Sequence, residues 1–82
     1  MNKIEVREKV REFLPSMLLK TFAAAVKEST IFLTPFIEDK SIDGFDTSYE
    51  ESDNSFTLDV YYPDGLCDIF TVASYGISEV LS

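Results

Sequence analysis

ESTIFLTPFIED, residues Glu28–Asp39, is the stretch around which the rest of the chain is organised. Its first half, Thr30–Leu33, is rich in β-branched and aromatic side chains, which favour a strand. Its second half carries the signals of a helix start, because Thr34 can cap a helix and Pro35 suits the first helical position. The sequence therefore predicts a short strand over Thr30–Leu33, followed directly by a short helix from about Pro35 to Lys40.

In residues 2–27, which precede this stretch, the apolar side chains are spaced as they are in helices. These side chains recur at steps of three and four, so they form one stripe. The stripe consists of Val6, Val10, Phe13, Leu14, Met17, Leu18, Phe22, Ala25 and Val26. Pro15 interrupts the stripe, because proline lacks a backbone donor and clashes with the preceding turn. We expect either a break near Phe13–Leu14, with a second helix from Pro15, or a kink at that point.

The residues after the stretch have the patterns of strands separated by turns. The clearest strand is Ser55–Tyr62, where apolar and polar side chains alternate. Pro63–Gly65 is a typical turn, so this strand should pair with the apolar segment that follows it. The predicted strands of this region are Phe45–Tyr49, Ser55–Tyr62, Leu66–Ser74 and Ile77–Leu81.

These elements define the predicted fold class. Hairpins with short connections favour an antiparallel sheet. The apolar stripe of the helices has to be buried, and one face of such a sheet provides the apolar surface for it. The sequence predicts an α+β fold, with an antiparallel sheet of four to five strands, flanking N-terminal helices and one short helix after the first strand. Its 82 residues suffice for a single domain, residues 1–82, with one modest core.

Charge is distributed unevenly along the chain, which has a formal net charge of −8. Residues 1–27 contain six Lys or Arg and three Glu, whereas residues 28–82 contain one Lys and twelve acids. Direct binding of nucleic acid is disfavoured, because phosphate contacts need Lys and Arg. Two interpretations stay open: the acids serve solubility, or they form a surface that imitates a polyanion.

The sequence offers little for catalysis or for a cofactor. It has no histidine, and a lone Cys67 without histidine makes neither a thiol enzyme nor a zinc site. The acid-rich segment Asp43–Asp53 lacks the ligand spacing of a calcium loop. No run of residues is long enough to span a membrane, and a single cysteine suits a reducing cytoplasm. We therefore expect a binding protein without cofactor or metal rather than an enzyme.

Several short motifs occur in a characteristic order. Glu28–Ser29 heads the predicted strand, Leu33 and Pro35 mark the helix start, and Thr47–Ser52 reads TSYEES before the alternating strand. In this order the chain resembles the phage-type uracil-DNA glycosylase inhibitor family over about Glu28–Val80. It departs from the family in the extra Thr34, in a shorter segment after Pro35 and in a longer helical N-terminus.

The resemblance implies a function and a set of site residues. Members of the family are DNA mimics that occupy the DNA groove of uracil-DNA glycosylase and block uracil excision. Glu28 and Ser29 would lead the strand that enters this groove, and Glu38 or Asp39 would supply the acids of the second helix. An apolar cavity for the base-wedging side chain of the enzyme would be lined by Phe32, Ile37, Ile42, Leu58, Val60 and Phe70. The same six residues could equally form an ordinary core.

The resemblance also implies the partner and the compartment. The partner would be uracil-DNA glycosylase in a 1:1 complex in the bacterial cytoplasm, without direct contact to nucleic acid or membrane, and the free protein would be monomeric. One alternative is a DNA mimic that inhibits another DNA-binding defence protein, such as a restriction or CRISPR effector. Another is a general interaction domain whose acids are merely solvated.

Overall fold

The computed structural model describes all 82 residues, and its first element is helix α1 (Lys3–Phe13). Asn2 caps this helix: its side chain accepts a hydrogen bond from the Glu5 amide, and Glu5 accepts one from the Asn2 amide. The predicted break near Pro15 is confirmed, because α1 ends at Phe13 and the 3₁₀ turn η1 (Leu14–Met17) follows. The second helix, however, begins at Phe22 and not at Pro15.

Helix α2 (Phe22–Glu38) is the element that the sequence patterns described wrongly. No strand forms over Thr30–Leu33 and no separate helix begins at Pro35, since one continuous helix includes both segments. The reason lies in the buried positions Ala25, Ser29, Leu33 and Phe36, which recur at steps of three and four. Packing of this stripe on the sheet overrides the local strand preference.

The sheet has four strands in the order β1-β2-β3-β4, all antiparallel. Their bounds are β1 (Gly44–Glu50), β2 (Ser55–Tyr61), β3 (Cys67–Ala73) and β4 (Gly76–Val80). The predicted α+β class and the predicted pairing of β2 with β3 are confirmed; Leu58, for example, lies opposite Phe70. The short helix expected after the first strand is absent, because α2 precedes β1.

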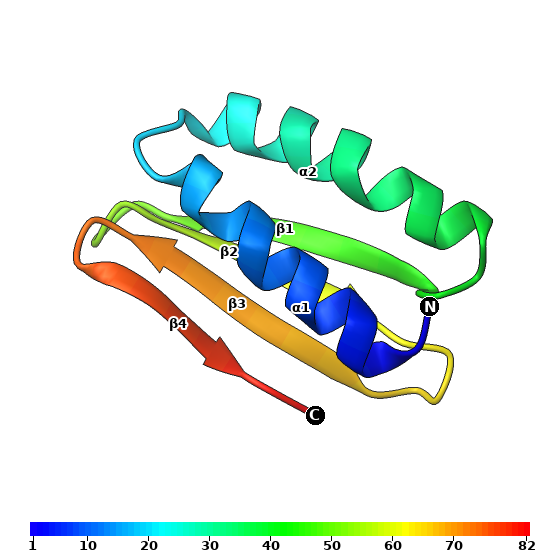
Figure 1. Ribbon diagram of the computed structural model, residues 1–82. Coiled ribbons are helices and arrows are strands. Elements are labelled where there is room, and N and C mark those ends of the chain that lie inside the picture. Colours follow the sequence, from blue (N-terminus) through cyan, green and yellow to red (C-terminus); the bar gives the residue numbers. More distant parts are fainter.

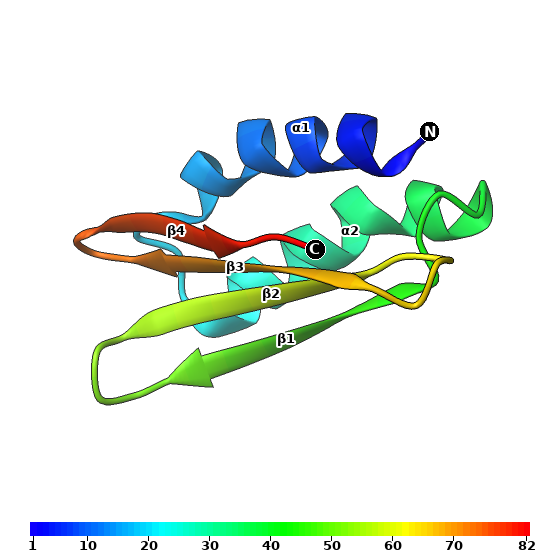
Figure 2. The same ribbon diagram turned by 90° about the horizontal axis from the view of Figure 1, so that it is seen from below.

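The helices and the sheet form two layers. Figure 1 shows α1 and α2 side by side over the sheet, and Figure 2 shows that both lie on the same face of it. The other face of the sheet carries no element. None of the helices combines the length and the apolar composition that a membrane span requires. The core between the layers consists of Val6, Val10, Leu14, Met17, Ala25, Leu33, Phe36, Ile42, Phe56, Leu58, Val60, Tyr62, Phe70 and Val72.

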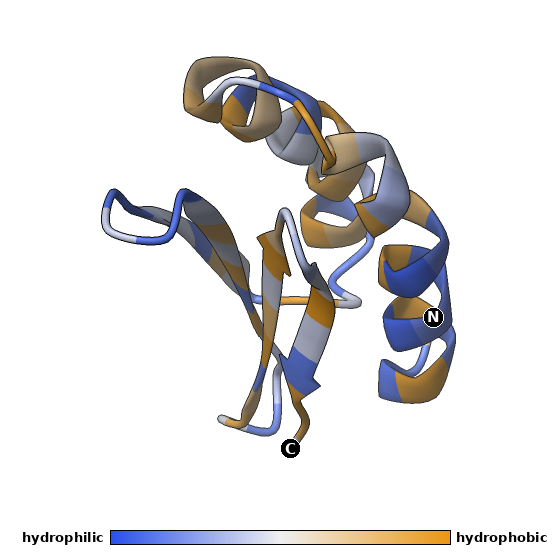
Figure 3. Cartoon of the chain, turned by 90° about the vertical axis from the view of Figure 1, so that its left-hand side faces the viewer, coloured by the Kyte–Doolittle hydropathy of each residue, from blue (hydrophilic) through white to orange (hydrophobic).

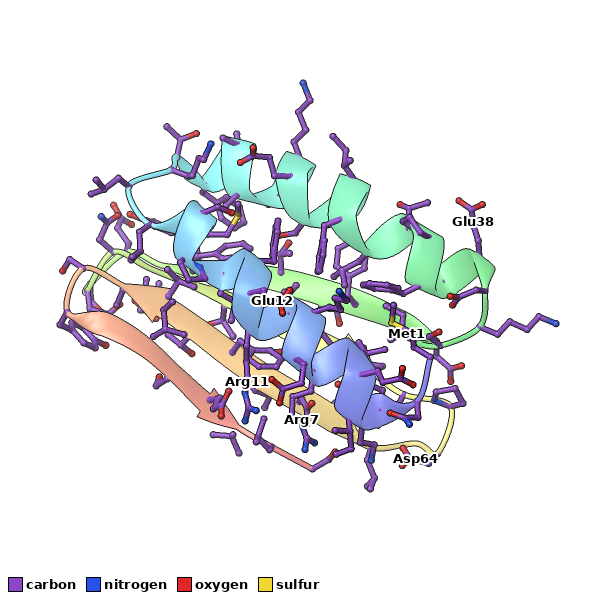
Figure 4. All side chains as sticks on the ribbon, in the orientation of Figure 1. Met1, Arg7, Arg11, Glu12, Glu38 and Asp64 are labelled. Carbon is purple, nitrogen blue, oxygen red and sulfur yellow. The ribbon has the colours of Figure 1, made fainter.

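A buried carboxylate joins α1 to the sheet and to the C-terminal residue. Asp68 of β3 is fully buried and accepts two hydrogen bonds from the Arg7 guanidinium, at 2.9 and 3.0 Å. It also accepts hydrogen bonds from the Tyr62 hydroxyl at 2.6 Å and from the Ser82 amide at 2.9 Å. Burial opposes ionisation of Asp68, but these hydrogen bonds outweigh it and lower its pKa to about 2. In Figure 4, Arg7 extends from α1 toward the C-terminal end of the sheet.

Candidate protein-binding surface

The first two residues implied by the resemblance, Glu28 and Ser29, lie on α2 and not at the head of a strand. Glu28 is half-buried and forms an ion pair with Lys20, with the Lys20 Nζ and Glu28 Oε2 atoms 3.1 Å apart. Ser29 is fully buried, and its hydroxyl has no hydrogen-bond partner. The expectation that these residues lead an exposed strand was therefore wrong, since their backbone is helical.

The acids expected in the first turn of a helix, Glu38 and Asp39, lie at its end. Glu38 is the last residue of α2, and Figure 4 shows its side chain pointing away from the sheet. Asp39 is the C-cap, and its carboxylate accepts a hydrogen bond from the Ser41 amide at 2.9 Å. Hydrogen bonds from the Ser41 side chain and backbone lower the pKa of Asp39. Because both acids lie at the C-terminal end of α2, their negative charges interact unfavourably with the helix dipole.

The six apolar residues implied by the resemblance mostly form the core. Ile42, Leu58, Val60 and Phe70 are buried among other core side chains. Phe32 packs against the core and stacks on Phe13, with ring centroids 4.2 Å apart. Ile37 is exposed. A pocket of about 740 Å³ lies elsewhere in the molecule, and none of the six residues lines it. Of the two interpretations left open by the sequence, the structure thus favours a filled core for most of this set.

The acid-rich region of the surface is the β1–β2 hairpin, which we define as residues 43–59. This acidic hairpin contains six carboxylates and no Lys or Arg. None of the six takes part in any of the five ion pairs of the structure, whereas four of the seven Lys and Arg side chains do. The six acids are Asp43, Asp46, Glu50, Glu51, Asp53 and Asp59.

The strand register places two of these acids directly opposite each other. Asp46 of β1 pairs with Asp59 of β2, and both side chains point to the uncovered face of the sheet, because their strand neighbours Phe45 and Val60 pack toward the helices. The Tyr61 hydroxyl donates a hydrogen bond to Asp46 Oδ2 at 3.0 Å. The Asp59 Oδ1 atom is buried and has no hydrogen-bond partner.

This pairing perturbs the ionisation of Asp59. Burial, with a further contribution from the negative charge of Asp46, raises its pKa. Like charges directly opposite each other across two strands are destabilising. A positive charge near Asp46 and Asp59 would lower the electrostatic cost of both carboxylates. No group of three or more His, Cys, Asp or Glu side chains is arranged to hold a metal ion.

The acids of β1 also have a purely structural use. β1 is an edge strand, and charged side chains on an edge discourage pairing with a strand of another molecule. This accounts for Asp46 and Glu50 on the edge. It does not account for Asp59, which lies on an inner strand. The Asp46–Asp59 pair therefore needs an explanation beyond protection of the edge.

The sequence contains a signal for this hairpin beyond the TSYEES motif. The acid-rich segment Asp43–Asp53 includes the predicted strand Phe45–Tyr49 and directly precedes the predicted strand Ser55–Tyr62. The direct pairing of Asp46 with Asp59 follows only from the strand register of the structure. No protein-family model, no curated protein and no solved structure matches this chain.

Proposed function

We propose that this protein inhibits a DNA-binding enzyme by occupying its DNA groove, with uracil-DNA glycosylase as the first target to test. The observation that carries the proposal is the acidic hairpin, whose six carboxylates lack any ion-pair partner within the molecule. Grooves that bind DNA present Lys and Arg to the phosphates, so they complement such a surface. This target would place the protein in the cytoplasm of a bacterial host.

The resemblance supports the choice of target through one motif in particular. The TSYEES segment, Thr47–Ser52, forms the end of β1 and the start of the β1–β2 turn, so it lies within the acidic hairpin. The Glu28–Ser29 motif lies on α2, where Glu28 is paired with Lys20. The proposed contact surface is therefore the acidic hairpin, with Glu38 and Asp39 as separate acids at the end of α2.

Electrostatics would act mainly on the rate at which the complex forms. Exposed acids such as Glu51 steer a basic partner toward the hairpin, and their loss lowers the association rate. The half-buried Asp59 would instead pair with a cation in the complex, and its loss would speed dissociation. The same acids would also recognise a second class of target, a restriction or CRISPR effector. Only inhibition assays with several enzymes therefore distinguish the two classes of target.

The direct test is a uracil-excision assay with purified protein and glycosylases from several bacteria. Inhibition should be complete near a 1:1 molar ratio, and the protein should bind no DNA by itself. Excision that continues unchanged in molar excess of the protein, for every glycosylase, would reject this target and favour the restriction or CRISPR effector.

Charge reversals locate the contact surface. Glu51→Lys should weaken inhibition, whereas Glu12→Lys on α1 should not. Both side chains are exposed and neither makes an ion pair or a hydrogen bond, so the two variants are matched. Figure 4 shows Glu12 on α1, the helix in front of the sheet in that view. Glu28→Lys and Glu38→Lys test the acids that the resemblance implies, and equal effects of all four reversals would show that general acidity suffices.

A further inference from the structure

We propose that the pocket at the turn end of the sheet binds an amphipathic helix of a partner protein, with apolar side chains in the pocket and Lys or Arg facing the acidic hairpin. The proposal rests on the proposed function only in expecting a basic protein partner. It adds a second contact region, which is apolar and which none of the residues implied by the resemblance lines.

The pocket lies where three connections gather at one end of the molecule. Figure 1 shows the α1–α2 connection, the β1–β2 turn and the β3–β4 turn together at this end. The pocket has a volume of about 740 Å³. This is within the ~300–1,000 Å³ range of sites that bury a drug-sized ligand, so more than one side chain can enter. Met17–Phe22 form one wall, and Tyr49, Phe56 and Val72–Ser74 belong to the sheet side.

Exposed apolar side chains gather around this pocket. Leu19 is fully exposed, and Leu18, Phe22 and Tyr49 are each more than one-third exposed. Leu19 also has a φ of 67°, a left-handed conformation that is unusual for a residue other than glycine, asparagine or aspartate. An apolar residue held outward in this way gains nothing from the fold itself. Clustered exposure of this kind marks interaction sites, whereas single exposed apolar residues need no explanation.

The charges at the rim select the kind of partner. Glu50, Glu51 and Asp53 lie in the chain between Tyr49 and Asn54, which both line the pocket, and none of the three acids has an ion-pair partner. Lys20 is the only cation that lines the pocket, and it is paired with Glu28. A fatty acid, an anionic lipid or a nucleic acid would therefore meet negative charge without a free cation. A partner with Lys or Arg next to its apolar side chains has the complementary charge.

A helix is the element that presents both features together. Apolar side chains at steps of three and four form one face, and basic side chains beside them reach the rim. Figure 3 views the molecule from the turn end and shows hydrophilic residues in the β1–β2 turn. Tyr49 and Asn54 line the pocket and flank the acids of the β1–β2 turn in the chain, so one amphipathic helix can contact both the pocket and the acidic turn.

Three synthetic peptides test the proposal by isothermal titration calorimetry. The first has leucine at helical steps of three and four and lysine elsewhere. The second keeps the leucines and replaces each lysine by glutamate, and the third has the composition of the first in a shuffled order without helical periodicity. The first should bind at least tenfold more tightly than either other peptide. Equal binding of the shuffled peptide would show that net charge alone is responsible and would overturn the proposal.

A matched pair of variants locates the binding. Leu19→Ser should weaken binding of the first peptide at least tenfold, whereas Ile31→Ser should leave it unchanged. Both residues are exposed aliphatic side chains, and Ile31 lies on α2 outside the pocket. Circular dichroism should show the same fold for both variants. Equal binding by the two variants would place the peptide elsewhere, and light scattering that shows a dimer dependent on Leu19 would assign the pocket to a second copy.

The proposed function and this inference can fail separately. If the first peptide binds through Leu19 but no glycosylase is inhibited, the choice of target fails and the pocket proposal stands. If a glycosylase is inhibited equally by the protein and by its Leu19→Ser variant, and the peptide does not bind, the pocket proposal fails alone.

Discussion

Two carboxylates in the sheet illustrate how neighbouring residues set opposite outcomes for the same side chain. Asp68 is fully buried but receives hydrogen bonds from Arg7, Tyr62 and Ser82, so its pKa falls to about 2. Asp59 is less buried, but no hydrogen bond reaches its buried oxygen, so burial raises its pKa, with a further contribution from the negative charge of Asp46. The charge of Asp68 is compensated within the fold, whereas that of Asp59 is not.

Replacement of Asp59 by asparagine should stabilise the free protein. A raised folded-state pKa means that the ionised form destabilises the fold, so this cost is present at neutral pH and disappears as the pH falls below the unfolded value of 3.8. Asp59→Asn should therefore raise the free energy of unfolding at pH 7 by on the order of 0.5–1 kcal/mol, with little change near pH 3. Urea unfolding at the two pH values measures the difference. A loss of stability at pH 7 would mean that Asp59 is compensated in the free protein.

Removal of Arg7, the ion-pair partner of Asp68, should lower the free energy of unfolding, and by much more than Asp59→Asn raises it. Arg7→Ala leaves a buried carboxylate without its cation, which costs about 3–5 kcal/mol. Because the folded-state pKa of Asp68 is depressed, its contribution is present above pH 3.8 and is lost as the pH falls toward 2. Lys3→Ala breaks the more exposed Lys3–Asp64 pair and should cost about 0.2–1 kcal/mol. Thermal unfolding at pH 7 should rank the two variants in this order, and similar costs would contradict the structural role of Asp68.

At the level of elements, local patterns predicted the sheet and the break at Pro15, but not α2. The hairpins depend on alternation and on turn residues that are adjacent in sequence, such as Pro63–Gly65. The segment Thr30–Leu33 has local strand preference, and its helical state depends on contacts with a sheet that follows it in the chain. The candidate surface was missed for the same reason: the Asp46–Asp59 pair exists only once the strand register is known.

The helical conformation of Thr30–Leu33 can be tested by a substitution at the exposed residue Ile31. Ile31 lies on the outer side of α2, and alanine is a better helix former than isoleucine but a poorer strand former. Ile31→Ala should therefore raise the free energy of unfolding by about 0.3–0.5 kcal/mol if the segment is helical. Chemical denaturation monitored by far-ultraviolet circular dichroism gives this value. A loss of stability would instead favour the strand that local propensity predicts.

In the molecule as a whole, charge and apolar surface meet at one end. Four of the seven basic side chains are used in internal ion pairs, so the net charge of −8 is concentrated on the acidic hairpin and on scattered acids. The pocket lies beside the turn of this hairpin, and the helices leave the opposite face of the sheet uncovered. A partner at the turn end could therefore use electrostatic steering and apolar burial together, and the two contributions should respond differently to salt.

This difference gives a prediction for the complex with an inhibited enzyme. Raising the salt concentration from about 50 to 200 mM should slow association with the wild-type protein, because the Debye length shortens and exposed charges are screened. Glu51→Lys should lower the association rate at low salt and reduce its dependence on salt. Leu19→Ser should instead raise the dissociation rate about equally at every salt concentration, because apolar burial is not screened. Surface plasmon resonance separates the two rates, with Glu12→Lys and Ile31→Ser as the respective controls. If both test variants change only the association rate, the pocket makes no contact in the complex and the acidic hairpin acts alone.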